Sequence, residues 1–181
     1  VYTKDLLQPK LDVVNSSSVS STASTTITGF TPGAINLGSG ITGWVSLGVT
    51  DSKTITRIHN SFAFTVEGMT QLDASANEYY EYAIGVFVDD VLVVVRKYHK
   101  QKEDFTCSWN KFILNGVVNN LSIGNHSIKV MARNISSSSN LATQKIVYAG
   151  TATRSDGGTC DNMSSFLAKI SLNTTVVESI N

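Results

Sequence analysis

The fold is decided by residues 79–95, whose sequence is YYEYAIGVFVDDVLVVV. In the first half of this stretch the larger side chains alternate, so that Tyr80, Tyr82 and Ile84 share one face, as in a half-buried β-strand. Two aspartates at 89–90 then supply a short polar turn, and a second apolar run follows at once. The stretch therefore predicts an antiparallel β-hairpin.

The same period of two recurs along the rest of the chain. Turn residues separate the apolar runs roughly every ten residues, and no segment sustains the 3.6-residue period of a helix. We therefore expect an all-β protein, an antiparallel β-sandwich or barrel. Strands are expected at 41–49, 54–58, 61–67, 79–88, 91–98, 105–114, 126–133, 145–149 and 166–177.

Length and charge exclude several classes of function. The chain has 181 residues, which suggests one domain, and its 14 basic and 14 acidic residues give a net charge of +0. Such a balance argues against a nucleic-acid-binding protein or one attracted to an anionic membrane. No run of about 18 apolar residues is present, so we expect no insertion into a membrane. Only 15% of residues are charged, and the Ser- and Thr-rich remainder is typical of extracellular and virion β-proteins.

The N-terminal part of the chain differs from the rest. Residues 15–28 are nearly uncharged and rich in Ser and Thr, a composition that buries too little apolar surface to order itself. We therefore expect residues 1–28 to form an arm or linker that orders by contact with another chain. The β-domain is expected to span residues 29–181.

One predicted strand is apolar on both faces. Residues 91–95 read VLVVV, whereas a sandwich strand normally has one face on the core and one in water. A second cover is needed, from a loop, the N-terminal arm or a neighbouring subunit, and we favour the subunit. The resulting interface candidates are Tyr79, Phe87, Val91, Val93 and Val95.

The chain contains no recognisable catalytic motif. Its three histidines, His59, His99 and His126, stand in no metal-ligand spacing, and no nucleophile elbow or phosphate-binding loop occurs. We therefore expect no catalysis, no metal and no cofactor. Exposed aromatic and basic side chains could still form a ligand surface, and the candidates for it are Trp44, Tyr98 and His99.

Two cysteines are too few for a disulfide framework. Cys107 alternates with Phe105 and Trp109 and is interpreted as a core side chain, whereas Cys160 lies in a polar loop. Both a buried free thiol and a Cys107–Cys160 bridge remain open. N-x-[ST] patterns begin at six asparagines, but about three would arise by chance in so Ser- and Thr-rich a chain, so glycosylation is not established.

Three stretches carry a resemblance to a known family: YAIGVFVDDVLV at 82–93, FILNG at 112–116 and NLSIGNHSIKV at 120–130. Together with the closing run at 160–173, they resemble jelly-roll domains of tailed-bacteriophage fibre and capsid-decoration proteins. Those domains are similar to the trimeric tumour-necrosis-factor fold. The resemblance implies a non-enzymatic homotrimer on a virion, assembled in the host cytoplasm and joined to other virion proteins through residues 1–28.

A second function remains open. The same strand–turn–strand rhythm occurs in carbohydrate-binding modules and in adhesin domains of secreted proteins, and the exposed loops of a virion domain could also contact host-surface glycan. Oligomeric state separates the two readings, because a binding module is usually a monomer whereas the virion jelly roll is a trimer.

Overall fold

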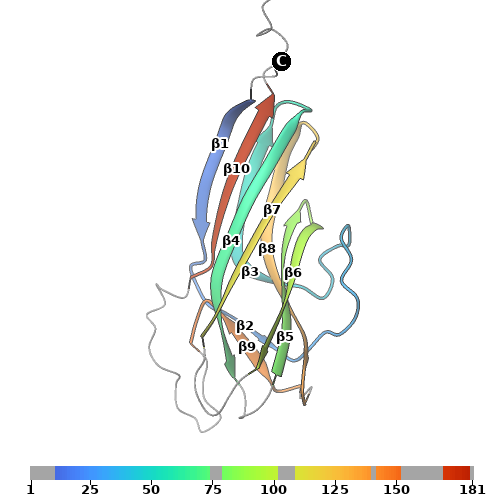
Figure 1. The fold of residues 1–181 in the computed structure, drawn as a ribbon, viewed down its shortest axis with the longest axis vertical. Helices are drawn as coiled ribbons and strands as arrows, with labels where there is room; N and C mark the ends of the chain where they lie inside the picture. The colour runs from blue at the N-terminus through green and yellow to red at the C-terminus, as the bar shows by residue number, and fades with distance from the viewer. Residues whose placement is uncertain (1–10, 74–78, 102–108, 140–141, 152–168, 180–181) are drawn as a thin grey trace, which may run out of the picture.

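The computed structural model describes residues 11–73, 79–101, 109–139, 142–151 and 169–179. These residues form ten strands in two antiparallel sheets that pack face to face (Figure 1). The first sheet contains β1 (Leu11–Ser20), β10 (Ser171–Ser179), β4 (Asn60–Asp73) and β7 (Trp109–Asn119). The short strand β9 (Lys145–Tyr148) pairs with the last four residues of β4, and β2 (Thr25–Thr28) pairs with β9. The second contains β3 (Val45–Ile55), β8 (Gly124–Ser137), β5 (Tyr79–Val88) and β6 (Val91–Gln101).

The strand order is that of a jelly roll. Taken in chain order without β2 and β9, the eight long strands are arranged first–eighth–third–sixth in one sheet and second–seventh–fourth–fifth in the other. Two interlocked Greek keys of this kind define the fold. The prediction of an antiparallel β-sandwich with jelly-roll topology is therefore confirmed.

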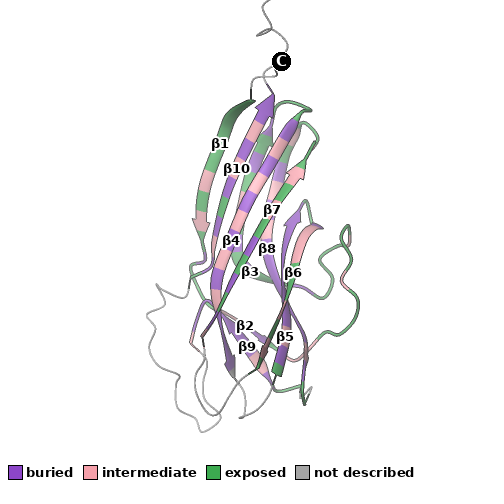
Figure 2. Cartoon of the chain, viewed as in Figure 1, coloured by how far each residue is buried: buried purple, intermediate pink, exposed green. Residues whose placement is uncertain are grey.

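The core lies between the sheets and follows the predicted alternation (Figure 2). Phe62, Phe64 and Val66 of β4 point inward and are at most 4% exposed, while the residues between them face outward. Tyr80 and Tyr82 of β5 are fully buried against them from the other sheet. The period of two in the sequence thus identifies the inner face of each central strand correctly.

The N-terminal segment belongs to the sheets, contrary to our expectation of an arm. Residues 11–20, which we expected to be part of an arm, form strand β1 and pair with β10 along its whole length. Residues 25–28 form β2 and pair with β9. Pairing needs only backbone N–H and C=O groups, which a Ser-rich strand has in full. The boundary at residue 28 is therefore wrong for the described chain, which belongs to the sandwich from residue 11.

The two apolar faces of β6 arise from a β-bulge. Phe87 pairs with Leu92 but Val86 pairs with Val94, so that Val93 is the extra residue. Val93 and Val94 therefore pack toward the main core, while Leu92 packs in a second apolar cluster on the outer side of the sheet. The candidates Val91, Val93 and Val95 imply strict alternation, which fails at Val94, because Val93 and Val94 both point inward and Val95 points outward.

The cover of the outer face is a loop of the same chain. Residues 29–44, between β2 and β3, cross the outside of the second sheet, and Trp44 packs edge-on against Phe87 with ring centroids 5.3 Å apart. The guanidinium of Arg133 holds the loop by donating to the carbonyls of Thr31 (2.7 Å) and Pro32 (2.8 Å). The loop, one of the three covers considered, is thus the one present.

A buried polar cluster joins the two sheets at one edge. Lys53 of β3 is only 2% exposed, and its Nζ lies 3.0 Å from Oδ2 of Asp51. The same oxygen accepts hydrogen bonds from Ser17 of β1 (2.6 Å) and Thr174 of β10 (2.9 Å). Although burial raises the pKa of Asp51, these donors and Lys53 outweigh it and lower that pKa. Ser17 of β1 is therefore used in the fold as a hydrogen-bonding side chain.

Candidate functional site

The outer face of the first sheet is an uncharged surface built from β1, β10, β4 and β7. Its cross-strand neighbours follow directly from the register, because residues opposite one another point to the same side of a sheet. Three rows across four strands give twelve positions, which we call the neutral face. The rows are Val13–Val177–Ser61–Asn119, Ser16–Thr175–Ala63–Val117 and Ser18–Asn173–Thr65–Asn115.

No acidic or basic side chain occurs at any of the twelve positions, which carry five hydroxyls, three amides and four aliphatic groups. Charge begins only in the next row, where Glu67 lies 3.7 Å from Lys111. Surface strands of soluble proteins usually interleave Lys and Glu, which keep sheets from associating. The neutral face lacks this protection.

The centre of the neutral face is hollowed along β4. Ala63 and Thr65 are small, and the larger side chains of β7 and β10 rise on either side. The hollow has a volume of about 460 Å³ and is open to solvent. Asn115 and Asn173 stand on its two walls, and neither side chain has a hydrogen-bond partner among the described residues. Their amide groups are therefore available to a molecule that covers the face.

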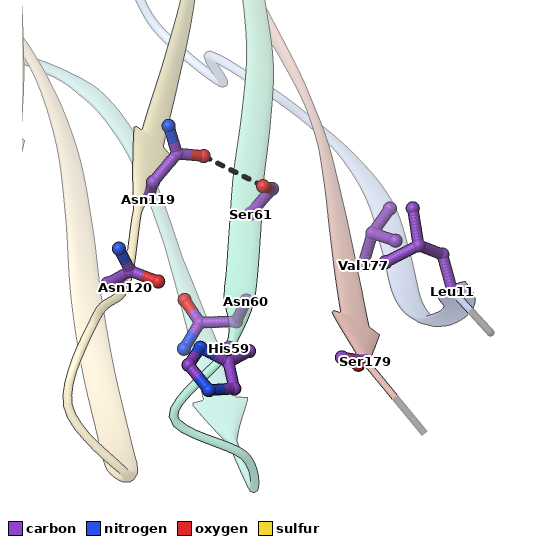
Figure 3. Close-up of a pocket in the computed structure, with 8 residues that line it drawn as sticks. All are labelled: Leu11, His59, Asn60, Ser61, Asn119, Asn120, Val177 and Ser179. Atoms are coloured by element: carbon purple, nitrogen blue, oxygen red, sulfur yellow. Dashed lines mark hydrogen bonds between the residues drawn. The ribbon is translucent and has the colours of Figure 1, made fainter. Parts of the chain in front are cut away.

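A second hollow of about 490 Å³ continues the face at the end where β1 begins (Figure 3). Leu11 and Val177 lie on one side of it and Asn119 on the other, with Ser61 between them. The Ser61 hydroxyl donates to the Asn119 side chain at 2.7 Å. Aliphatic and polar groups thus lie side by side at this end of the face.

The structure separates the five interface candidates. Phe87 is 0% exposed under Trp44, so it has no surface to offer a neighbouring subunit, and that expectation is wrong. Val91 (43% exposed) pairs with Val88 next to the hairpin turn, whereas Tyr79 (37% exposed) pairs with Gln101 at the opposite end of the same two strands. Val93 and Val95 lie between them and are half-buried. The candidates do not form one patch.

The ligand-surface candidates are also divided. Trp44 is 8% exposed and belongs to the loop cluster, so it is no ligand platform. Tyr98 stacks on Tyr82 at 5.2 Å and donates its hydroxyl to the Ile113 carbonyl at 2.8 Å, which places it between the sheets' edges. His99 is exposed and stacks on Tyr79 at 5.1 Å. Only His99 keeps the open position that we expected.

Sequence reasoning missed the neutral face, although part of its signal was present. The outward positions of the predicted strands at 61–67 and 166–177 are mostly small and uncharged, but each strand alone resembles an ordinary solvated face. Only the register brings Asn115, Thr65 and Asn173 into one row. Cys107 and Cys160 lie outside the described residues, and the question of their pairing stays open.

Histidine 126 ties two turns together at one end of the sandwich. Its Nδ1 lies 2.6 Å from Oδ2 of Asp89, and its Nε2 lies 2.8 Å from the Ser122 carbonyl. Both partners are acceptors, so the doubly protonated ring satisfies both. The Ser122 carbonyl and Asp89 outweigh desolvation and raise the pKa of His126. Burial raises the pKa of Asp89, but hydrogen bonds from His126 and Ser127 lower it overall.

We expect this pair to stabilise the fold in a limited pH window. Because the pKa of His126 is raised above its ordinary 6.5, its contribution is full below that value and is lost as pH rises through the folded-state pKa. Because the pKa of Asp89 is lowered, its contribution is present above the ordinary 3.8 and is lost on further acidification. Urea unfolding between about pH 5 and 8 should show H126Q losing most stability at the acid end. An equal loss across that range would contradict the prediction.

Comparisons with known proteins give little beyond the architecture. No protein-family model matches the sequence, and the search of curated proteins found no match. A structure of infectious bursal disease virus, Gx strain, is similar over 90% of this chain and 39% of its own, with 14% identity and a TM-score of 0.38. The VP2 subviral particle of infectious bursal disease virus is similar over 93% of this chain and 42% of its own, with 14% identity and a TM-score of 0.37. Dimeric latent PorU from Porphyromonas gingivalis is similar over 90% of this chain and 13% of its own, with 7% identity and a TM-score of 0.35.

The chain therefore spans less than half the length of these structures. With TM-scores below 0.5, the likeness bears on no question of function, and the jelly-roll assignment rests on strand order. Among the described residues, no three His, Cys, Asp or Glu side chains gather as a metal site. The same part of the chain forms no helix that is long and apolar enough to cross a membrane.

Proposed function

We propose that this protein is a non-enzymatic structural component of a bacteriophage particle, a head-decoration or fibre protein that assembles as a homotrimer through its neutral face. The observation that carries the proposal is the uncharged outer surface of the β1–β10–β4–β7 sheet. The three-fold arrangement and the phage particle are supported by the sequence resemblance at 82–93, 112–116 and 120–130. The trimer contact is thus moved from β6, where we first sought it, to the opposite sheet.

A neutral face suits contact between identical copies. When a surface meets its own copy, each isolated charge would be removed from water without a guaranteed partner, which is costly. Hydroxyls and amides avoid that cost, since each can both donate and accept, and amides such as Asn115 and Asn173 find partners on another chain. Aliphatic groups such as Val117, which is 57% exposed, gain by leaving water.

The sharpest test is T65D. Thr65 lies beside the hollow along β4, is half-buried and has no hydrogen-bond partner among the described residues, so the change leaves the core untouched. An unpaired carboxylate in the closed contact should cost about 3 kcal/mol or more, which weakens association at least ~100-fold. We expect native mass spectrometry to show the natural chain as trimers or as assemblies built from trimers, and T65D as neither.

The matched control is T50D, which makes the same substitution at an exposed position of β3 in the other sheet, opposite Lys129. This variant should form trimers like the natural chain. If both variants associate equally, or if the natural chain forms neither trimers nor assemblies built from trimers, the neutral face is not the three-fold contact. Immunogold labelling of purified phage particles with an antibody against the sandwich tests the location. Failure to label the particles would count against the virion role.

A glycan-binding domain of a secreted protein is the second candidate, and the hollow along β4 favours it. Asn115, Asn173 and Thr65 present unpartnered amide and hydroxyl groups beside the aliphatic Val117, a combination that can bind the hydroxyls and C–H faces of a neutral sugar. In this case the chain should be monomeric, and N115A should abolish its binding to a neutral glycan array.

A further inference from the structure

The outer edge of β1 carries backbone groups that have no partner among the residues the structure describes. Just beyond this strand the Ser21 N–H donates to the Ile170 carbonyl at 2.8 Å, so Ser21 faces β10. Bonding alternates along an antiparallel strand, which directs the N–H and C=O groups of the odd-numbered residues in 15–19 toward β10 as well. No described strand lies on the other side of β1. The backbone groups that face away from β10 belong to Ser16, Ser18 and Ser20.

The two edges of the second sheet are protected against further pairing. Strand β3 is interrupted by a bulge between Ser46 and Val49, where Gly48 has φ +68°. Strand β6 carries Lys97 and Lys100 within its last five residues. Bulges and lysines are two of the devices that keep sheet edges from associating.

The remaining edges of the first sheet are protected in two other ways. Strand β7 is covered by β6, because Arg96 and the Tyr98 hydroxyl both donate to the Ile113 carbonyl, at 3.1 and 2.8 Å. Strand β2 has only four residues. Covering an edge and keeping it short are also standard protection. Every edge but one among the described strands is thus guarded.

The edge of β1 has no such device over residues 15–20. Its bulge lies earlier, between Val13 and Asn15, and its one charged residue, Asp12, precedes the bulge. The sequence NSSSVS that follows has no charge, no proline and no large side chain. This run can face its own copy without like-charge repulsion or steric conflict.

The run is also self-complementary in register. With a two-fold axis at Ser18, antiparallel pairing places Ser18 opposite Ser18 of the second copy, and Ser16 opposite Ser20. Three pairs that each exchange two bonds make six hydrogen bonds, which use every free N–H and C=O of these serines. All three side chains belong to the outward side of the sheet, so the two sheets join without a change of face.

We propose that β1 is a docking edge for β1 of a second copy of this chain, paired antiparallel about a two-fold axis at Ser18. The pairing uses backbone groups at a sheet edge, whereas the three-fold contact uses side chains on a sheet face. Because Ser16 and Ser18 belong to both surfaces, the loss of pairing is measured with the three-fold contact disabled by T65D. Where both contacts form, the pairing joins trimers two by two, and the repeated two-fold and three-fold contacts extend into a larger assembly.

The first experiment removes one backbone donor. S18P deletes an N–H that faces away from β10, a position where an edge strand tolerates proline, whereas S18A keeps the N–H and serves as the control. In the T65D background, which disables the three-fold contact, sedimentation equilibrium should show dimers. Adding S18P should weaken that dimer at least tenfold, and adding S18A should not. Equal dimerisation of folded S18P and S18A, judged by unchanged melting, would overturn the proposal.

The second experiment reads the register. Opposed residues of a bonded pair have Cα atoms about 5.5 Å apart, which suits a disulfide. S18C should therefore give a disulfide-linked dimer under mild oxidation, seen on a non-reducing gel beside the natural chain. S16C should give none, since Cys at 16 lies four residues, about 13 Å, along the strand from its copy. Absence of the S18C dimer refutes pairing at this axis.

The two proposals fail separately. Trimers of the natural chain together with monomeric T65D would refute the β1 pairing and leave the three-fold contact standing. Dimers of both the natural chain and T65D would refute the three-fold contact and leave the pairing. Pairing of β1 with a strand of another protein would appear as loss of that complex in S18P with no S18C homodimer, and it also overturns the proposal.

Discussion

Replacing Asp51 by alanine should lower the free energy of unfolding by about 3–5 kcal/mol, one of the two largest effects we expect in this chain. Asp51 is the partner of Lys53, whose side chain is 2% exposed and cannot turn to water. Without the carboxylate, the ammonium keeps only neutral oxygens of Ser17 and Asn15. The charge then remains buried without compensation, and unfolding releases it.

The measurement is urea unfolding of D51A at neutral pH. D90A is the matched control, because the carboxylate of Asp90 also contacts a lysine, Lys129, at 2.6 Å but is 52% exposed. A surface pair of this kind contributes about 0–1 kcal/mol. Equal destabilisation by the two variants would show that the Asp51–Lys53 cluster is not buried as described.

The same cluster explains why the N-terminal segment was misjudged from its sequence. Low hydrophobicity predicts that a segment cannot order itself, and residues 15–28 fit that rule. However, β1 does not need a core of its own, since β10 supplies backbone partners and the Lys53 ammonium donates a hydrogen bond to the Ser17 hydroxyl oxygen. Composition shows how much apolar surface a segment can bury, but it does not show which hydrogen-bond partners the other strands offer it.

The hairpin at 79–95 shows the opposite case. Its alternation, its Asp89–Asp90 turn with φ +51° and +65°, and its antiparallel pairing could all be predicted from neighbouring residues. The bulge at Val93 could not, because no residue pattern distinguishes two consecutive inward valines from a regular strand. One extra residue exchanged the faces of the strand and gave the wrong interface set.

The neutral face, like the bulge, could not be predicted from the sequence. Alternation assigned an outward side to the expected strands at 61–67 and 166–177, but a surface also depends on which strands are neighbours and on their register across β1, β10, β4 and β7. Residues 16 and 117 are far apart in the sequence and lie in one row of the sheet. An uncharged patch is therefore invisible until the sheet order is known, and Asn115, Val117 and Asn119 lay outside the strands that we expected.

The outer cluster under the loop 29–44 provides the second large prediction. Replacing Phe87 by alanine should cost about 3–5 kcal/mol, because the ring is fully buried and its removal leaves a cavity beneath Trp44. The loop is held near its start by Arg133 and at its middle by Leu92, so it cannot easily collapse into the space. Urea unfolding should show the loss in monomer and oligomer alike.

V91A is the control for this prediction, because Val91 is 43% exposed on the partner strand and should change stability by no more than about 0.5 kcal/mol. Oligomeric state decides between the two origins of the apolar outer face. If the loop covers Phe87, F87A destabilises the subunit and leaves association at the neutral face unchanged. If a neighbouring subunit covered it, F87A would dissociate the assembly while each subunit melted normally, and the loop would then have to leave Trp44 exposed.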